Sequence, residues 1–248
     1  MGPSLRFCMV TTFYPPYSFG GDGMFVYRFS NLLAERGHSV DVIHCRDAYY
    51  AQHATEPVGE WPNHPRITLH SLKSKAGILS PLLTQQLGIP GLKAGKIKRI
   101  LTEGRFDVIH YHNVSLVGGP KVLEYGCAIK LYTTHEYWLL CPTHVLFKFN
   151  QEACTKPSCL MCQLSCRKPP QLWRYTGIMD RALRQLDAVI SPSQFAADAH
   201  RHMGLNVEKT VIPMFVPSRQ AEQERGEFLP ASLPDGQLPY FLYVGRLE

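Results

Sequence analysis

The N-terminal part of the chain contains a pattern that few folds accommodate. Two apolar runs rich in β-branched residues, Leu5 to Thr12 and Ser39 to Cys45, flank a helical stripe from Met24 to Arg36. Gly37 ends that stripe, because glycine adopts the left-handed conformation that commonly closes a helix. A buried strand, a helix and a second buried strand in close succession form a right-handed crossover unit with parallel strands.

The same alternation continues along the chain. Apolar residues make up 45% of the sequence and charged residues only 19%, which supports a sizeable core. We therefore predict an α/β fold, with a doubly wound and mostly parallel Rossmann-like sheet. Residues 46–65 interrupt the pattern as a polar surface excursion, and residues 76–91 as an apolar stretch broken by proline and glycine. The further predicted strands are 66–72, 106–110, 128–133, 188–191 and 207–213, and the further predicted helices are 93–103, 116–125, 172–186 and 194–203, the last capped by Ser193.

The element pattern ends near residue 213. We expect residues 1–213 to form one Rossmann-like lobe, with a cysteine-rich insert at 139–170. Residues 214–238 have the proline, glycine and charge content of a linker. The run 239–248 resumes as a strand, which we interpret as the first strand of a second lobe that this chain does not contain.

A glycine cluster lies between the first predicted strand and the helical stripe. Gly20, Gly21 and Gly23 surround Asp22 at this junction. Residues without a Cβ atom let backbone N–H groups and the positive end of a helix dipole approach an anion. The cluster therefore predicts a phosphate site, although a plain tight turn would need the same residues.

Further short motifs occur at or near predicted strand and helix ends in a set order. They occupy residues 14–23, 35–40, 107–113, 134–138 and 244–248. In this order they resemble the family-4 retaining glycosyltransferases, over nearly the whole chain. The resemblance implies the N-terminal, acceptor-side lobe of a GT-B fold, in which two Rossmann-like lobes face each other across a cleft.

The same resemblance implies an activity and roles for single residues. Such enzymes transfer a sugar from a nucleotide-sugar, here a UDP- or GDP-sugar, with retention of configuration and without a catalytic metal. The expected acceptor is a sugar or a lipid-linked glycan. The residues that carry over are His135 and Arg246 as catalytic groups, Gly20, Gly21, Gly23 and Arg246 at the donor phosphates, and His112, Glu136 and Trp138 on the acceptor side.

This sequence departs from the family pattern in several places. Glu136 stands where aspartate is commoner, and Met214-Phe215 replace an expected Asn-Gly. The lysine that normally follows the arginine is absent, as are two later glutamates that hold the donor. We therefore expect this chain to have weak transfer activity, or none, on its own.

The histidines at strand ends are the first candidates for sugar contacts. His110, His112 and His135 fall at or just beyond the carboxyl ends of predicted strands, where open α/β sheets bind ligands. Imidazoles can donate hydrogen bonds to sugar hydroxyls or phosphate near neutral pH. His110 has an alternative orientation into the sheet.

Cysteines crowd into the predicted insert. Cys154, Cys159, Cys162 and Cys166 have a density that would let four thiolates surround a structural zinc ion. Cys141 precedes them. No second C-x2-C arm exists, so free or redox-linked thiols and an iron–sulfur cluster stay open as alternatives.

The net charge of +6 suits an anionic partner such as a nucleotide diphosphate or an acidic membrane face, or else belongs to solvated helix faces. Nucleic acid is not an expected partner, because no recognisable basic module exists. We expect a cytoplasmic protein, peripheral at the inner membrane face, with no secretory signal.

Two other classes remain open. One is a non-catalytic module with a cysteine metal clip that binds a glycan, a lipid carrier or a partner protein. The other is a nucleotide-dependent oxidoreductase, which the first loop disfavours because it is not G-x-G-x-x-G placed directly after the strand.

Overall fold

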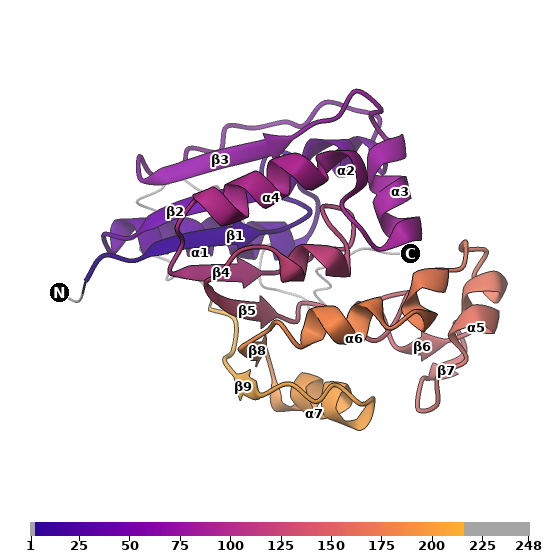
Figure 1. Cartoon of the computed structure of the whole chain (residues 1–248). Helices are drawn as coiled ribbons and strands as arrows, with labels where there is room; N and C mark the ends of the chain where they lie inside the picture. Colours follow the sequence, from indigo (N-terminus) through magenta and orange to yellow (C-terminus); the bar gives the residue numbers. More distant parts are fainter. Residues whose placement is uncertain (1–2, 216–248) are drawn as a thin grey trace, which may run out of the picture. The chain divides into compact units, whose positions relative to one another are not determined.

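A computed structural model describes residues 3–215 of the chain, and Met1–Pro213 forms one compact unit. A parallel sheet of seven strands runs through this unit in the order β3-β2-β1-β4-β5-β8-β9 (Figure 1). The predicted α/β fold with a doubly wound parallel sheet is confirmed. The strands are β1 Arg6–Val10, β2 Ser39–Cys45, β3 Ile67–Leu72, β4 Val108–Tyr111, β5 Ile129–Thr133, β8 Ala188–Ser191 and β9 Lys209–Val211.

Helices cover both faces of this sheet. α1 (Gly21–Glu35) packs on one face, where its apolar side chains meet Met9, Val40 and Val42. α4 (Ala94–Glu103), α6 (Ile178–Leu183) and the 3₁₀ turn η2 (Pro120–Glu124) pack on the other face (Figure 1). The remaining helices are α2 Arg46–Tyr50, α3 Leu79–Leu87, α5 Cys159–Ser165 and α7 Gln194–His202, with 3₁₀ turns η1 Gly91–Lys93 and η3 Leu172–Tyr175.

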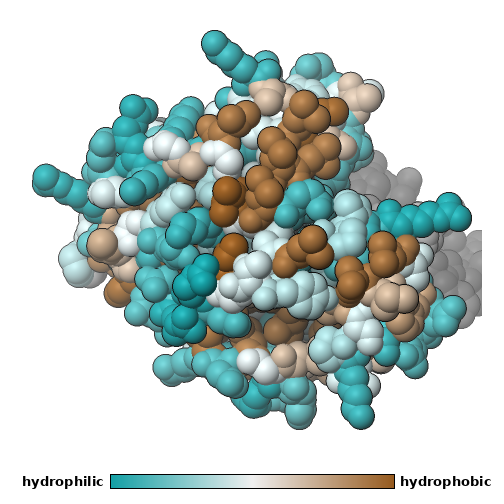
Figure 2. All heavy atoms as spheres, turned by 45° about the vertical axis from the view of Figure 1, so that its right-hand side comes forward, coloured by the Kyte–Doolittle hydropathy of each residue, from teal (hydrophilic) through white to brown (hydrophobic). Residues whose placement is uncertain are grey.

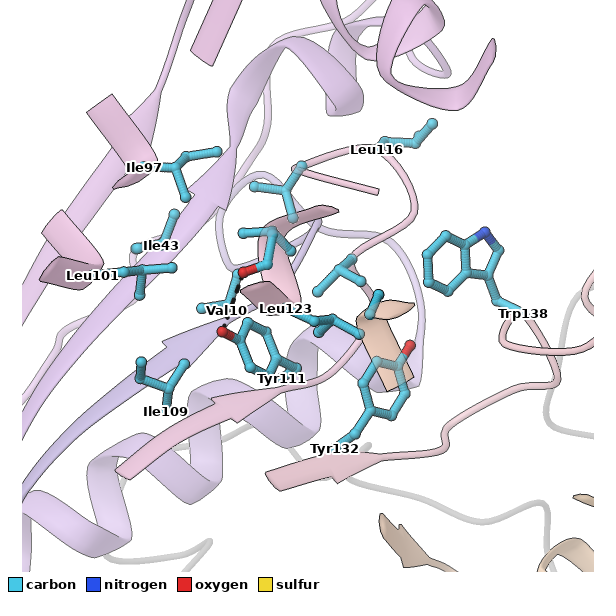
Figure 3. Packing of buried hydrophobic residues seen from close by; sticks show 14 of the residues in the cluster. Val10, Ile43, Ile97, Leu101, Ile109, Tyr111, Leu116, Leu123, Tyr132 and Trp138 are labelled. Carbon is cyan, nitrogen blue, oxygen red and sulfur yellow. Dashed lines mark hydrogen bonds between the residues drawn. The ribbon is translucent and has the colours of Figure 1, made fainter. Parts of the chain in front are cut away.

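The core on the α4 side is built from alternate strand residues. Val10, Ile43 and Ile109 project from three adjacent strands toward Ile97 and Leu101 of α4 (Figure 3). Each such side chain contributes roughly 1.5–3 kcal/mol when it is fully buried. Because successive strand residues point to opposite faces, buried runs on these strands supply two cores at once.

The predicted strands and several helices are confirmed with small shifts. β2 and β8 have the predicted bounds, and Ser193 caps α7 by accepting a hydrogen bond from the Ala196 N–H at 3.2 Å. α1 begins at Gly21 rather than at Met24, because Gly20 is the N-cap with a φ of 115°. Gly21 and Gly23 therefore belong to the first turn of the helix instead of the loop before it.

Two predicted helices are wrong. Residues 116–125 form only the short turn η2, because Gly119 has a φ of 61° and any Cβ there would lie 2.7 Å from the backbone of Gly88. The predicted helix 172–186 is broken into η3 and α6 at Gly177, whose φ is 73°. The stretch 46–65, predicted as a surface excursion, begins with α2, in which Asp47, Ala48 and Tyr49 are buried.

The stretch 139–170 contains a short antiparallel hairpin, β6 Phe147–Lys148 with β7 Glu152–Ala153, followed by α5. Among the described residues, no helix is both long and apolar enough to span a bilayer. The predicted linker from residue 216 onward, the predicted strand 239–248 and Arg246 lie outside the part that the structure describes.

Candidate functional site

The sequence-predicted site residues lie at one edge of the sheet. β1 pairs with β2 on one side and with β4 on the other, so the chain changes direction across the sheet between β1 and β4. Ligands of open α/β sheets bind outside the carboxyl ends of strands at such a switch point. The glycine cluster follows β1, His112 follows β4, and His135 and Glu136 follow β5.

The three glycines of the first loop differ in what they tolerate. Gly20 has a φ of 115°, a conformation that L side chains rarely adopt. At Gly23 an added Cβ would lie 2.2 Å from Ser18 Oγ and 3.1 Å from the Phe13 carbonyl oxygen. At Gly21 an added Cβ would meet nothing within 4 Å, and the residue is exposed. Packing therefore explains Gly23, and backbone conformation explains Gly20, whereas neither explains Gly21.

This contrast yields a first prediction. We expect Gly21→Ala to leave the free energy of unfolding unchanged or to raise it by up to about 1 kcal/mol, because alanine has the higher helix propensity. We expect Gly23→Ala to lower it by about 1–3 kcal/mol, because the Cβ overlaps Ser18. Urea denaturation of both variants checks the pair, and equal destabilisation of the two would contradict the geometry.

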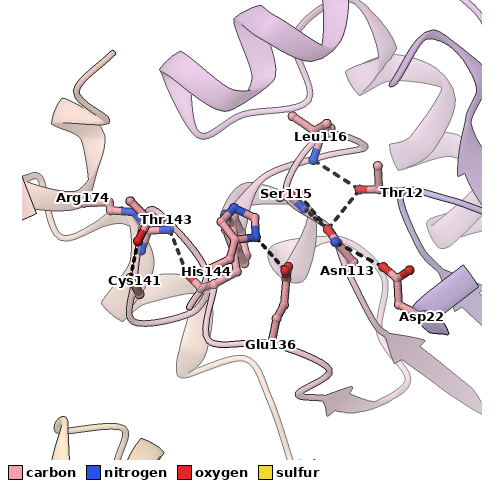
Figure 4. A network of polar contacts seen from close by, with 11 residues as sticks. Thr12, Asp22, Asn113, Ser115, Leu116, Glu136, Cys141, Thr143, His144 and Arg174 are labelled. Carbon is pink, nitrogen blue, oxygen red and sulfur yellow. Dashed lines mark hydrogen bonds and ion pairs between the residues drawn. The ribbon is translucent and has the colours of Figure 1, made fainter. Parts of the chain in front are cut away.

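Asn113 joins the loop after β4 to Thr12 and to the first turn of α1 (Figure 4). Its Oδ1 accepts hydrogen bonds from the Ser115 N–H at 3.1 Å and from the Ser115 hydroxyl at 2.7 Å. Its Nδ2 donates to Asp22 Oδ2 at 3.3 Å, across 91 positions of sequence. Thr12 Oγ1 lies 3.3 Å from Asn113 Oδ1 and accepts from the Leu116 N–H at 3.2 Å. The network holds the β4 loop against the first turn of α1.

Asp22 is a site residue that the sequence interpretation missed. Its Oδ1 accepts from the Gly23 N–H at 2.8 Å, in the first turn of α1. Burial raises the pKa of this carboxyl above its usual value, and the negative charge of Glu136 raises it further. An acidic residue inside a glycine cluster at a helix start was the available signal, because such a residue favours the positive end of the helix dipole.

Three histidine rings stack beside this network. The His110 and His112 ring centroids lie 4.2 Å apart, and His112 Nδ1 lies 2.9 Å from His135 Nε2. Phe25 of α1 packs edge-on against His135, with 5.3 Å between the ring centroids. His110 and His112 are buried, at 4% and 0% exposure, whereas His135 is half-buried. Of the three rings, His135 is therefore the one that can meet a ligand.

The hydrogen bond between His112 and His135 indicates which ring nitrogen carries the proton in each residue. His112 Nε2 is buried without a partner among the described residues. A buried N–H without an acceptor is costly, so His112 carries its proton on Nδ1 and donates to His135 Nε2. That assignment leaves the proton of neutral His135 on Nδ1. Burial lowers the pKa of His135 to about 4, so the ring is neutral at pH 7.

His110 turns into the sheet face and is not a ligand candidate. Its Nε2 lies 2.7 Å from the Thr133 hydroxyl of β5. Burial, together with a smaller contribution from nearby His135, lowers the pKa of His110 to about 3. The alternative orientation of His110 into the sheet is confirmed.

The two other acceptor-side residues differ in exposure. Glu136 is half-buried, and its Oε2 lies 2.7 Å from His144 Nδ1 (Figure 4). Its Oε1 has no hydrogen-bond partner among the described residues. Trp138 is only 2% exposed and belongs to the core cluster of Figure 3, so its ring packs beneath the site rather than at its surface.

The cysteines do not gather as the zinc prediction requires. Within residues 3–215 no three His, Cys, Asp or Glu side chains form a group that could hold a metal ion, and the cysteines there are free. The thiols bond elsewhere: Cys141 Sγ lies 3.1 Å from the Thr143 hydroxyl, and Cys154 Sγ donates to the Lys156 carbonyl oxygen at 3.8 Å. Burial raises the pKa of Cys154 and Cys159, which favours neutral thiols. One small apolar pocket is lined by Cys141, Cys154, Cys159 and Cys162, but not by Cys166.

Comparison with known families decides the class of the chain. A model of Glycosyltransferase Family 4 matches residues 19–220, which is most of the sequence. The chain belongs to Glycosyltransferase Family 4. The match includes the glycine cluster after β1, the His112 loop and the His135 loop, whereas β1 itself lies before the matched residues.

Individual relatives of this family-4 chain are distant. An uncharacterized 42.6 kDa protein in the cps region of Klebsiella pneumoniae is 26% identical over 159 residues, which are 61% of this chain and 42% of that protein. A glycosyltransferase from Rickettsia africae has 12% identity and a TM-score of 0.45, over 92% of this chain and 47% of the other. A sucrose-phosphate synthase from Thermosynechococcus elongatus has 14% identity and a TM-score of 0.44, over 89% and 95%. This chain thus spans less than half of the Klebsiella protein, and the family assignment rests on the sequence match.

Proposed function

We propose that this chain is the acceptor-side lobe of a retaining glycosyltransferase that transfers a sugar from a UDP- or GDP-sugar to a sugar or lipid-linked glycan. The observation that carries the proposal is the half-buried His135 ring, held by His112 at the switch point of a family-4 sheet. The nucleotide-binding groups, Arg246 among them, are assigned to a second lobe.

The donor diphosphate would approach the start of α1. Its N–H groups and the positive end of a 15-residue helix face the edge of the sheet there, and Gly21 leaves room for the phosphate oxygens. Departure of a nucleotide diphosphate builds negative charge, and fixed donors aimed at that charge lower the barrier.

The transferred sugar and the acceptor would meet His135 and Glu136. A neutral His135 with its proton on Nδ1 donates a hydrogen bond to a sugar hydroxyl without adding charge. Glu136 Oε1, which has no partner among the described residues, accepts a hydrogen bond from an acceptor hydroxyl. Asn113 holds the His112 loop against the first turn of α1.

Substitution of His135 tests the proposed function. In the full-length protein we expect His135→Ala to lower kcat by about 10²–10³-fold, the effect of removing one fixed donor from a transfer site. We expect His202→Ala, which changes an exposed histidine on α7, to leave kcat unchanged. Transfer assays with matched circular dichroism check this, and full activity in a folded His135→Ala variant would refute the role. The 248-residue chain alone is expected to transfer little.

An exposed apolar surface, which we call the α3 surface, suits a membrane-bound acceptor. Apolar side chains gather on the face that Figure 2 brings forward. Exposed Lys73, Lys75 and Lys96 lie close to α3 in the sequence. Apolar side chains with flanking lysines favour the surface of an anionic membrane. The exposed apolar residues of the α3 surface are Ile78, Leu79, Leu82, Leu83, Leu87, Ile89 and Leu92.

Vesicle binding tests this proposed location. We expect the chain to sediment with anionic phospholipid vesicles, and the double variant Leu82→Ser and Leu83→Ser to lose at least about tenfold in partition, because roughly 1.5 kcal/mol is lost for each leucine kept out of the bilayer. Val58→Ser, at another fully exposed apolar position, serves as the control. Equal sedimentation of the two variants would overturn the membrane contact.

A further inference from the structure

A second hollow lies on the β2 side of the glycine cluster. Its empty space is ≈ 380 Å³, counting its open mouth. The cavity itself is ≈ 120 Å³, below the roughly 300–1,000 Å³ of pockets for drug-sized ligands, so it suits one ring rather than a whole nucleotide. It is lined by Pro15, Pro16, Ser18, Gly20, Met24, Tyr49, Pro57, Val58 and Trp61.

The lining is neutral and combines flat apolar surface with unused polar groups. None of its residues carries a charge. Among the described residues, the Tyr49 hydroxyl and the Trp61 indole N–H have no hydrogen-bond partner, and Ser18 Oγ is buried without one. The Tyr49 hydroxyl and the Trp61 N–H therefore have capacity for a ligand.

Trp61 is held in place from two sides. Its ring meets Tyr27 of α1 edge-on, with 5.5 Å between centroids. Its carbonyl oxygen accepts from Asn63 Nδ2 at 3.2 Å, and Asn63 Oδ1 accepts from the Tyr14 hydroxyl at 2.6 Å. A fixed aromatic ring beside unpaired hydroxyl and N–H groups matches the two-sided chemistry of a sugar, whose C–H face is apolar and whose rim carries hydroxyls.

We infer that this pocket binds one neutral sugar ring of the acceptor, stacked on Trp61 and hydrogen-bonded by Tyr49. The inference rests on the proposed function, because it assigns the ring to the acceptor. The lining has no cationic side chain to balance the charge of a diphosphate, which favours a neutral ligand. Gly20 lines the pocket and also caps α1, so the bound ring and the transfer site share one loop.

Nuclear magnetic resonance on the 248-residue chain tests the inference without catalysis. The probes are the methyl pyranosides of glucose, galactose and mannose, with UDP as the charged comparison. We expect at least one pyranoside to shift the Trp61 indole N–H signal in a saturable way, and UDP to leave it in place. No saturable shift with any of the three, or an equal shift with UDP, would overturn the assignment.

Variants separate stacking from folding. Binding of the pyranosides to the variants is measured by saturation-transfer difference. We expect Trp61→Ala to weaken pyranoside affinity at least about tenfold, and Tyr49→Phe, which keeps the aromatic ring and loses only the hydroxyl, to weaken it severalfold. Phe195→Ala removes a 78% exposed ring on α7, outside this lining, and is expected to bind as the parent chain does. If a folded double variant, Tyr49→Phe with Trp61→Phe, binds the pyranosides with unchanged affinity, the assignment of the sugar to this pocket is wrong. If no pyranoside binds while His135→Ala still lowers kcat, this inference alone is wrong. If a pyranoside binds while His135→Ala leaves kcat unchanged, the proposed transfer role is wrong.

Discussion

Acidification from pH 7 is expected to unfold this chain with a midpoint near about pH 5. Burial lowers the pKa of His44 and His110 to about 3 and of His135 to about 4, and holds that of His112 well below its usual 6.5. Above pH 6.5 these rings are neutral in the folded and the unfolded chain alike. As the pH falls below that value, these histidines bind protons in the unfolded chain but not in the folded chain, so the free energy of unfolding decreases.

The size of the effect follows from the number of rings. Each contributes up to about 1.4 kcal/mol per pH unit until the folded pKa is reached. By pH 5, about 1.5 units below 6.5, the four rings together remove about 8 kcal/mol, which is comparable to the roughly 5–15 kcal/mol that stabilises a typical domain. Asp22 acts in the opposite direction, because its raised pKa lets the folded state bind a proton first, but it is one group against four.

Urea denaturation at several pH values measures this slope. We expect His110→Gln to make it shallower by about 1.4 kcal/mol per pH unit, since Gln Nε2 retains the contact with Thr133 but does not titrate. We expect His202→Gln, at an exposed position, to leave the slope unchanged. A free energy of unfolding that is constant from pH 7 to pH 5 would show that these rings are not buried in the neutral form.

Trp138→Ala is expected to lower the free energy of unfolding by about 3–5 kcal/mol. The indole is 2% exposed in the core cluster, and the Arg174 guanidinium carbon lies 5.5 Å from the centre of its ring. Arg174 Nη2 also donates to the Trp138 carbonyl oxygen at 2.7 Å, and Trp173 packs nearby with 6.3 Å between ring centroids. Removal of the indole leaves a cavity that these neighbours fill only in part.

The same substitution separates a packing role from an acceptor contact. We expect Trp138→Phe to lose less stability than Trp138→Ala, because a smaller cavity remains. Thermal and urea denaturation of both variants provide the comparison. If Trp138→Ala retained full stability and lost only acceptor affinity, the indole would act at the surface of the site instead.

Much of the fold was predictable from local patterns. The β-branched runs at Ser39–Cys45 and Ala188–Ser191 became strands with the predicted bounds, since a buried strand needs only a continuous apolar run. The two wrongly predicted helices, 116–125 and 172–186, failed because of single glycines. Gly119 and Gly177 adopt positive φ values that a helical stripe does not reveal, because what they permit is a close approach or a reversal of the chain.

The candidate site was predictable only in part. Its position at the carboxyl ends of strands followed from the motifs, and the order of those motifs indicated the family. The contact between Asp22 and Asn113, 91 positions apart, was not predictable, nor was the set of cysteines that share a pocket. Such contacts depend on which loops a sheet brings together, and no local period encodes that.

The sequence by itself determined the alternation of strands and helices and the membership in Glycosyltransferase Family 4. The tertiary structure alone decided that His112 and His135, 23 positions apart, form one hydrogen-bonded pair, that Trp138 lies in the core, and that Tyr49 and Trp61 line one pocket. The physical reason is strand order. Periodicity tells which face of a strand is buried, whereas the pairing of β1 with β4 and of β4 with β5 sets which loops become neighbours.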